Sequence, residues 1–270
     1  MTDIPPSHPR YASLKARERL VAGVRAGITS EAGLIAHGRG EAFDYLLGEE
    51  TVEEAREAAT VAAAMLLLAD RPVMSVNGNV AALAVDQVVE LQERVHELRV
   101  SRGAKEPAFP IEVNLFHRTE DRVKAITKVL RDAGAVGVLG EQPNMKVPGL
   151  DHARALCSKS GVGSADVVLI PLEDGDRAEA LRAWDRYVIA IDLNPLARTS
   201  RAAHVTLVDE LTRALPAIKT AAEGLEHRSH RALATMIKEW DNGAMLSRTL
   251  ERISDRLTTM GADQLDPEGI

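Results

Sequence analysis

The chain has 270 residues, 45% of them hydrophobic and 27% charged, which is the composition of a globular protein with a sizeable core. A net charge of -7 and an aromatic content of 3% argue against a general nucleic-acid or anionic-membrane surface. The single cysteine, Cys157, excludes an intrachain disulfide and a cysteine-rich zinc site, and no apolar run suits a signal peptide or a membrane span, so we expect a cytoplasmic protein.

The first 50 residues or so predict a helical arm. Apolar residues recur at helical spacing over residues 11–26, and Gly27 ends the pattern. In the glycine-rich stretch that follows, Arg39 stands between two glycines, so the backbone there could approach a ligand closely. The alternative is a tight structural loop before a helix that begins near Glu41.

The next stretch predicts a buried helix and the first strand of a sheet. Thr51 and Glu54 have the spacing of a capping box at the start of an alanine- and leucine-rich helix that reaches residue 69. Residues 72–77 predict a strand, and Asn77-Gly78-Asn79 the turn into a helix over 80–98. A strand, a glycine turn and a helix N-terminus form a natural anion site, although an ordinary turn capped by an asparagine fits the residues equally well.

Strands and helices continue to alternate as far as residue 192. Further strands are predicted at 111–116, 135–139, 165–171 and 188–192, with helices at 120–132 and 174–186. Residues 100–110, with Arg99 before them, predict a basic surface loop, and the chain from residue 204 predicts mostly helix, with breaks at Pro216, Gly224 and Gly243.

This alternation predicts a doubly wound, mostly parallel α/β sheet of about five strands, with extra helices at both termini. We expect residues 1–270 to form a single α/β domain, with the helical arm at about 1–50 and C-terminal helices at about 208–260. The terminal helices would cover the sheet or form a dimer interface.

Polar residues stand where several predicted strands end. Arg118 follows the strand at 111–116, at a place where an anion could be bound. Lys146 lies between two prolines in the segment 140–149, and is either part of a mobile active-site loop or a solvated surface lysine.

The strand at 188–192 carries the densest set of polar residues. Ligands of open parallel sheets lie beyond the carboxyl ends of the strands, where Asp192 and Asn194 would project. Arg198, four residues after Asn194, offers a planar cation that suits phosphate. The alternative is a polar turn in which an acid or amide caps the next helix.

Together these positions predict an enzyme that uses a nucleotide and an anionic cosubstrate, because cations and backbone amides suit phosphates, and an acid and an amide suit a ribose or a base edge. A non-catalytic nucleotide-binding regulatory protein on the same sheet is the alternative. A nicotinamide dehydrogenase would need a glycine fingerprint that the chain does not carry.

Five long motifs resemble one family over roughly residues 3–258. They resemble archaeal phosphopantothenate synthetase, the 4-phosphopantoate–β-alanine ligase of coenzyme A biosynthesis. Two departures are a stretch near 99–109 that looks like an insertion and Glu210, which stands where the family pattern leads us to expect asparagine. The motifs are Ile4-Pro5-x-Ser7-His8-Pro9-Arg10-Tyr11-x-Ser13-Leu14-x-x-Arg17-Glu18, Ala32-Gly-Leu-Ile-Ala-His-Gly-Arg-Gly-Glu-Ala-Phe-Asp-Tyr-Leu46, Ser75-Val-Asn-Gly-Asn-Val-Ala-Ala-Leu83, Asn114-Leu-Phe-x-Arg118-Thr119 and Asp192-Leu-Asn-Pro-Leu-Ala-Arg-Thr199.

The resemblance implies a Rossmann-like homodimer that uses ATP with Mg²⁺ to join 4-phosphopantoate and β-alanine, releasing AMP and pyrophosphate. Adenylation would activate the carboxylate, because a free carboxylate is a poor electrophile. The family's ATP-contacting positions fall here on Arg17, Arg39, Asp192, Leu193, Asn194, Arg198, Thr199, Glu210 and Leu211.

Two further roles complete the predicted site. We expect the substrate's phosphate to lie against the amides after Asn77, Gly78 and Asn79, with Arg118 nearby. Lys146 and Arg39 are the residues predicted to act in the chemical step, where cations would neutralise the reacting phosphoryl oxygens.

Overall fold

The computed structural model describes residues 4–8 and 10–265, so part of the predicted N-terminal arm, including Pro9 of the first motif, lies outside the described residues. The helices are α1 (Tyr11–Arg25), α2 (Glu31–Leu47), α3 (Glu53–Leu68), α4 (Gly78–Ser101), α5 (Glu120–Asp132), α6 (Gly175–Ala183), α7 (Arg198–Ala202), α8 (Leu211–Gly224), α9 (His230–Glu239) and α10 (Asn242–Leu265), with a 3-10 turn, η1, at Ala153–Ala155. The strands are β1 (Pro72–Val76), β2 (Ile111–Val113), β3 (Val138–Leu139), β4 (Met145–Lys146), β5 (Leu156–Cys157), β6 (Val167–Pro171), β7 (Tyr187–Ile191) and β8 (Val205–Leu207).

Six strands form one parallel sheet in the order β3-β2-β1-β6-β7-β8. Numbered along the chain within this sheet, the order is 3-2-1-4-5-6, which is that of a doubly wound fold with its topological switch point between β1 and β6. The predicted fold class is confirmed. The prediction of five strands missed β8, whose three residues are too few to show a periodicity.

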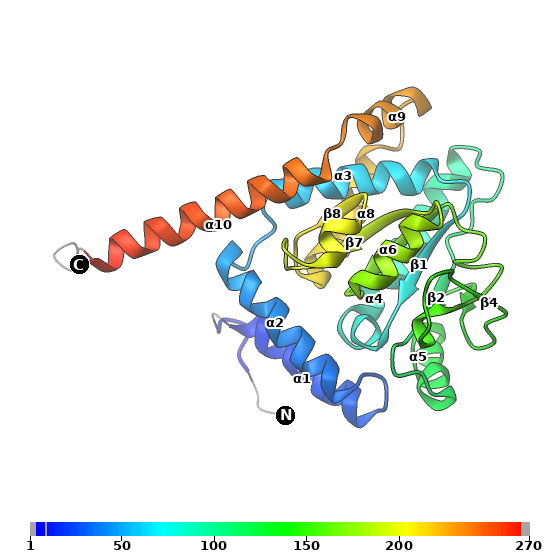
Figure 1. The fold of residues 1–270 in the computed structure, drawn as a ribbon, viewed down its shortest axis with the longest axis horizontal. Helices are drawn as coiled ribbons and strands as arrows, with labels where there is room; N and C mark the ends of the chain where they lie inside the picture. Colours follow the sequence, from blue (N-terminus) through cyan, green and yellow to red (C-terminus); the bar gives the residue numbers. More distant parts are fainter. Residues whose placement is uncertain (1–3, 9, 266–270) are drawn as a thin grey trace.

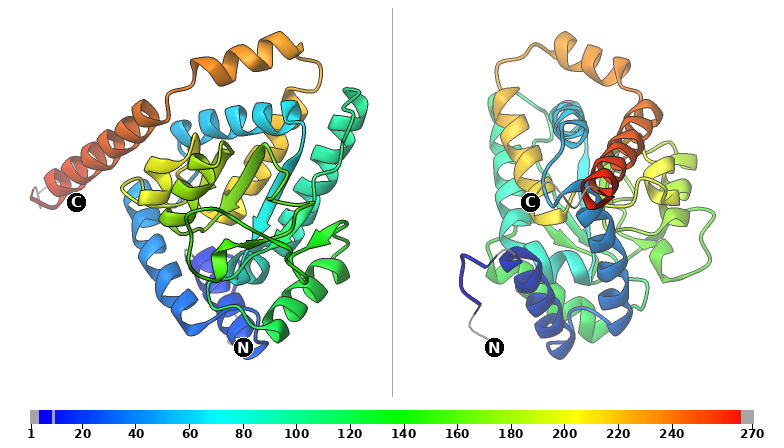
Figure 2. Two further views of the ribbon diagram at one scale, coloured as in Figure 1. Left: turned by 45° about the vertical axis from the view of Figure 1, so that its right-hand side comes forward. Right: turned by 90° about the vertical axis from the view of Figure 1, so that its left-hand side faces the viewer.

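Helices cover both faces of the sheet (Figure 1; Figure 2). One face packs Met74, Leu169 and Ile189 against α3, α4, α5 and α8. Their neighbours Val73, Val168 and Val188 point to the other face and pack against α6 and the segment that carries β5. Residues on both faces are therefore apolar, as expected of a buried parallel sheet.

The N-terminal arm folds as two helices, α1 and α2. Gly27, with φ of 69°, ends α1 as predicted. The glycine-rich stretch is helix throughout, so the predicted loop around Arg39 is wrong. Glycine destabilises a helix interior by about 1 kcal/mol relative to alanine, but Gly33 allows close packing, because a Cβ there would overlap Asn79. Gly40 faces Leu193, which a Cβ would meet at an ordinary contact distance.

The predicted capping box at the start of α3 is also wrong. The N-cap position is Val52, which has no side-chain cap. Thr51 donates a hydrogen bond of 2.7 Å to Asp209, and Glu54 pairs with Arg252 at 2.8 Å. Both side chains thus connect α3 to the C-terminal third of the chain.

Arg99 lies inside the protein rather than at a basic surface loop, because α4 continues to Ser101. Its fully buried guanidinium donates hydrogen bonds to backbone carbonyls, among them those of Leu66 and Ala69 at the end of α3. The last carbonyls of a helix have no intrahelical partner, so Arg99 supplies the missing donors.

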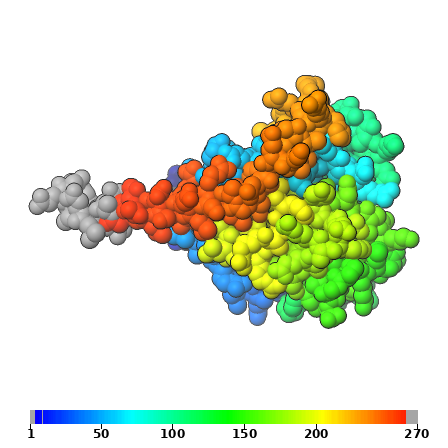
Figure 3. Space-filling view, turned by 45° about the horizontal axis from the view of Figure 1, so that its top comes forward, coloured from blue at the N-terminus to red at the C-terminus, as the bar shows by residue number. Residues whose placement is uncertain are grey.

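The C-terminal third is less interrupted than predicted. Pro216 lies inside α8 and Gly243 lies in the first turn of α10, so neither breaks a helix, whereas α8 ends at Gly224 as predicted. The first half of α10 packs on α2 and α3, and its second half projects from the body (Figure 1; Figure 3). Among the described residues, no helix is long and apolar enough to cross a membrane.

Candidate functional site

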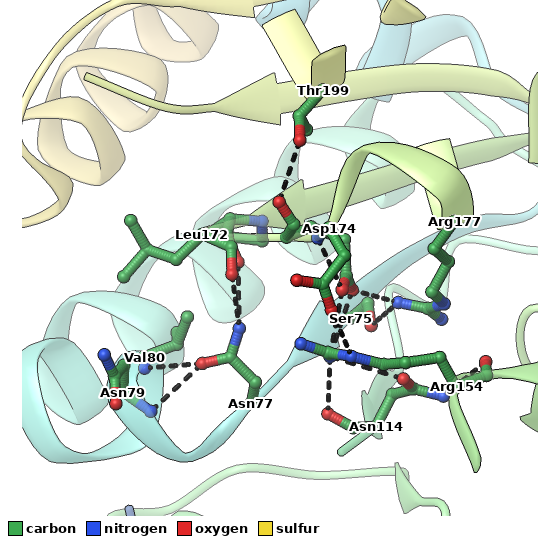
Figure 4. Close-up of polar contacts among 12 residues, drawn as sticks. Ser75, Asn77, Asn79, Val80, Asn114, Arg154, Leu172, Asp174, Arg177 and Thr199 are labelled. Atoms are coloured by element: carbon green, nitrogen blue, oxygen red, sulfur yellow. Dashed lines mark hydrogen bonds and ion pairs between the residues drawn. The ribbon is translucent and has the colours of Figure 1, made fainter. Parts of the chain in front are cut away.

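The switch point between β1 and β6 is closed by hydrogen bonds from Asn77. Its Oδ1 accepts from the backbone amides of Asn79 and Val80 at 3.0 and 3.2 Å, so this side chain caps α4. Its Nδ2 donates to the carbonyl oxygens of Pro171 and Leu172 at 3.2 and 2.9 Å (Figure 4). Two of the amides predicted to bind an anion are therefore occupied by the asparagine.

Beside Asn77 lies a charged cluster that the sequence analysis missed. Glu173, the second residue after β6, pairs with Arg154 at 3.0 Å and with Arg177, and Arg154 also pairs with Asp174 at 3.0 Å. Arg177 is fully buried and donates to Ser75 at 2.8 Å, while its Nε and Nη2 lack a partner among the described residues (Figure 4). Glu173 could have been selected from the sequence, because it stands at the end of a predicted strand. Arg154 could not, because the stretch around it has no periodicity that predicts a strand or a helix.

Two arginines follow β2, and one of them, Arg122, lies close enough to this cluster to be affected by the charge of Arg154. Arg122 donates to the carbonyl oxygen of Ile28 at 3.2 Å, and the same oxygen lies against Gly78, where a Cβ would overlap it. Burial, and then the charge of Arg154, lower the pKa of Arg122. Its guanidinium therefore lies at the first turn of α4.

Arg118 turns toward the edge of the sheet at β3. It donates to the carbonyl oxygen of Gly140, and burial lowers its pKa. In the described ranges 4–8 and 10–265, neither Arg118 nor Arg122 is ion-paired with a carboxylate.

Gly140 also lines a cavity of about 630 Å³ between α5 and residues 140–144.

The acid and amide after β7 lie at the other side of the switch point. Asp192 accepts a hydrogen bond of 2.9 Å from the backbone amide of Asn194, and burial raises the pKa of its carboxyl to about 6. Asn194 accepts from the amide of Leu196 at 2.9 Å. Both side chains therefore order the turn after β7, but neither caps the next helix, because the N-cap of α7 is Ala197 and has no side-chain cap. Asp192 remains a partly buried carboxyl with spare acceptor capacity.

The next predicted residues, Arg198 and Thr199, have partners outside the turn after β7. Arg198 is exposed and pairs with Glu179 on α6. The buried hydroxyl of Thr199 donates to the carbonyl oxygen of Glu173 at 2.8 Å (Figure 4). Thr199 thereby connects the turn after β7 to the cluster after β6.

Helix α2 brings the N-terminal arm to the carboxyl edge of the sheet, where Asp192 lies. Arg17, on α1, pairs with Glu41, on α2, at 2.7 Å. Arg39 is exposed. Glu210 caps α8 by accepting from the amide of Thr212 at 2.7 Å.

His37 is a further residue that the sequence analysis did not select. It lies on the face of α2 that carries Gly33 and Gly40, and Glu41 and Glu210 are among the charged groups close enough to affect its pKa. Leu211, which follows Glu210, is buried.

Lys146 lies on a paired strand and not in a free loop. β4 pairs antiparallel with β5, with Lys146 opposite Leu156, and the carbonyl oxygen of Leu156 accepts a hydrogen bond from Asn114 at 3.0 Å. The exposed lysine therefore lies near the end of β2, while Asp192 and Glu210 lie toward β8.

Comparisons with known proteins agree on one family. The family model for phosphopantothenate/pantothenate synthetase matches residues 54–256. The 4-phosphopantoate–β-alanine ligase of Methanosarcina mazei is 50% identical over 97% of this chain and 99% of its own length. The corresponding ligases of Thermococcus onnurineus and Thermococcus kodakarensis are 49% and 46% identical, over 96% and 97% of this chain and 95% and 97% of their own lengths.

The family model begins in α3, but the pairwise matches leave out only a few per cent of the chain and therefore extend into the arm formed by α1 and α2. The fold and the polar residues along its carboxyl edge thus belong to one continuous region of similarity. The chain belongs to the phosphopantothenate/pantothenate synthetase family.

Proposed function

We propose that this chain is an ATP-dependent ligase that joins 4-phosphopantoate to β-alanine, forming 4'-phosphopantothenate, AMP and pyrophosphate. The observation that carries the proposal is the division of the sheet edge into two sides. Arg122, which has no carboxylate partner among the described residues, lies beside α4, and a partly buried acid with an amide follows β7, in a chain about half identical to ligases of that name. The first side suits a phosphorylated acid, and the second suits a nucleotide.

The reaction would proceed in two steps. A carboxylate oxygen of 4-phosphopantoate attacks the α-phosphorus of ATP, and the bond to the bridging oxygen breaks to release pyrophosphate. The amine of β-alanine, after losing a proton, then attacks the acyl carbon of the adenylate. The C–O bond to AMP breaks, and a second proton leaves the nitrogen as the amide forms.

ATP would lie between α2 and the ends of β7 and β8. Asp192 would accept a hydrogen bond from a ribose hydroxyl, and Arg17 and Arg39 would contact the phosphates. Arg17 is already oriented by Glu41, whereas Arg39 is exposed and would have to turn toward the nucleotide. Arg39→Ala should then raise the ATP requirement without loss of fold.

The phosphate of 4-phosphopantoate would lie beside the first turn of α4, near Asn77, Gly78 and Asn79. Arg122 lies at this turn, and Arg118 reaches from the end of β2 to the carbonyl oxygen of Gly140. Neither cation has a carboxylate partner in the part of the chain that the structure describes. An unpaired, partly buried guanidinium is costly unless an anion binds to it, which supports the assignment.

Mg²⁺ fits this edge as a companion of ATP. Among the described residues, no three His, Cys, Asp or Glu side chains are grouped as a metal site of their own. Mg²⁺ commonly uses one or two protein carboxylates together with substrate phosphates and water, and Asp174 and Asp192 offer carboxylates at the strand ends. When bound, the ion would neutralise phosphate charge.

We also propose that the chain forms a homodimer. On α10, Ile253 is buried, and Leu257 and Met260 continue the same helical stripe with 51% and 47% of their surface exposed. The part of α10 that carries them projects from the body (Figure 3). An apolar stripe on a projecting helix suits burial against a second copy.

The test is AMP release with 4-phosphopantoate or pantoate, each with and without β-alanine. The proposal expects steady AMP release only when ATP, 4-phosphopantoate and β-alanine are all present, and exchange of pyrophosphate into ATP that needs 4-phosphopantoate but not β-alanine. Binding of ATP without either reaction would contradict it and favour the regulatory alternative.

A further inference from the structure

Helix α2 crosses the carboxyl edge of the sheet from the end of β1 toward the end of β7. Near its start, Gly33 lies against Asn79 at the first turn of α4. Two turns later, Gly40 lies against Leu193, the second residue after β7. Seven residues of helix span about 10 Å, so these two contacts fix the position and direction of the helix over the switch point.

His37 lies between these two contacts on the same face of α2, because residues three and four apart share a face. It therefore lies between the side of the edge that we assign to 4-phosphopantoate and the side that we assign to ATP. The charged groups that influence it are Glu41 and Asp44 on its own helix, Arg17 on α1, and Glu210 at the start of α8.

The Nε2 atom of His37 is buried and has no hydrogen-bond partner among the residues that the structure describes. Burial also lowers the pKa of the ring, which favours the neutral imidazole. A buried ring nitrogen without a partner is costly, and such groups in folded proteins usually have a function or an absent partner. Arg17, by contrast, is satisfied by Glu41.

We propose that His37 is a catalytic residue whose Nε2–H donates a hydrogen bond to a non-bridging oxygen of the ATP α-phosphoryl group during adenylation. The inference rests on the proposed ligase function. The carboxylate oxygen forms a bond to the α-phosphorus, the bond to pyrophosphate breaks, and no proton is transferred. A donor fixed on a helix between the two substrates stabilises the charge that collects on the phosphoryl oxygens.

A pair of substitutions tests the position of the donor. The amide nitrogen of glutamine can occupy the place of Nε2, whereas the shorter asparagine reaches only the place of Nδ1. His37→Asn should lower the rate of 4-phosphopantoate-dependent pyrophosphate exchange roughly 10²-fold at saturating substrates, with little change in the KM for ATP. His37→Gln should recover much of that rate. His227→Asn, at an exposed residue before α9, is the matched control and should exchange at the wild-type rate.

The outcomes separate the two proposals. A wild-type protein that shows neither exchange nor AMP release overturns the ligase function itself. A working wild type with an equally active His37→Asn variant, or with glutamine and asparagine equally inactive while both variants are folded, overturns the role of His37.

A measurement on the unaltered protein covers the case in which the variants do not fold. The probe is an unreactive sulfamate analogue of the acyl-adenylate, added to protein with ¹⁵N-labelled histidine. The Nε2 resonance of His37 should shift on binding. An unchanged resonance at saturation overturns the inference.

Discussion

Nδ2 of Asn79, on α4, donates a hydrogen bond of 2.9 Å to the backbone carbonyl oxygen of Gly33, on α2. A Cβ at position 33 would overlap the Oδ1 of the same asparagine and lie 2.6 Å from the hydroxyl oxygen of Thr29. The contact fixes the arm to the first turn of α4, so the amino-acid type at position 33 controls where α2 lies over the sheet edge.

Gly33→Ala should therefore displace α2 and lower ligase activity at least tenfold, while the sheet stays folded. Gly38→Ala is the control on the same helix, because a Cβ there meets nothing within 4 Å and alanine favours a helix over glycine by up to about 1 kcal/mol. It should keep full activity and raise the melting temperature. Activity measured beside thermal unfolding distinguishes these outcomes, and equal activity of the two variants would contradict the proposed role of the contact.

Asp192→Asn should weaken ATP use and yet stabilise the protein. Burial raises the pKa of the carboxyl to about 6, whereas an unfolded aspartate titrates near about 3.9. The folded state thus binds this proton more tightly than the unfolded state does. The wild type therefore loses stability as the pH rises from about 4 to about 6, and the asparagine variant does not incur this loss.

The gain in stability of Asp192→Asn over the wild type should be near zero below about pH 4 and reach up to about 3 kcal/mol above about pH 6. Urea unfolding across this range measures the difference. The KM for ATP should rise because the charged acceptor is lost. A variant that is less stable than the wild type at pH 7.5 would show that Asp192 is needed mainly to cap the turn after β7.

The order of elements was predictable because it depends on local patterns. Buried strands, such as the one predicted to end at Asp192, are apolar on both faces and can be recognised in the sequence. Helix α5 begins and ends at the predicted residues. Asn77 and Asp192 could be assigned to one edge of the sheet from the sequence, because the carboxyl ends of parallel strands share an edge.

Residues whose roles depend on distant contacts were not predictable. Arg99 resembles a surface cation in sequence and becomes buried only because α3 ends beside it. The glycines of α2 suggested a loop because their packing partners, Asn79 and Leu193, are remote in the chain. His37 and Arg154 were missed for the same reason.

Arg118→Ala should weaken binding of 4-phosphopantoate and leave ATP almost unaffected. The side chain has no carboxylate partner among the described residues, and removal of a guanidinium from a partly buried phosphate contact costs about 2–5 kcal/mol. Separate KM values for the two substrates measure this. Arg131→Ala, which removes an exposed arginine paired with Glu141, is the control. An equal rise of both KM values would place Arg118 outside the phosphate site.

Lys146→Ala tests the residue predicted to act in adenylation. The carboxylate and phosphate reactants repel each other as they approach, and a cation at that place typically contributes a few kcal/mol to the rate. Lys146 lies above the end of β2, on the side of the edge assigned to 4-phosphopantoate, and its side chain is exposed. Its long side chain could turn toward the reacting groups when both substrates are bound.

Turnover of Lys146→Ala should therefore fall by at least tenfold, with much smaller changes in either KM. Lys159→Ala, at another exposed lysine shortly after β5, is the control and should keep wild-type turnover. Steady-state rates at saturating ATP and 4-phosphopantoate decide the result. Because β4 is held by β5 on one side only, the lysine needs no rearrangement of the main sheet to reach the substrates. If Lys146→Ala turns over as fast as Lys159→Ala, the lysine is a solvated surface residue and the cations of the adenylation step are arginines.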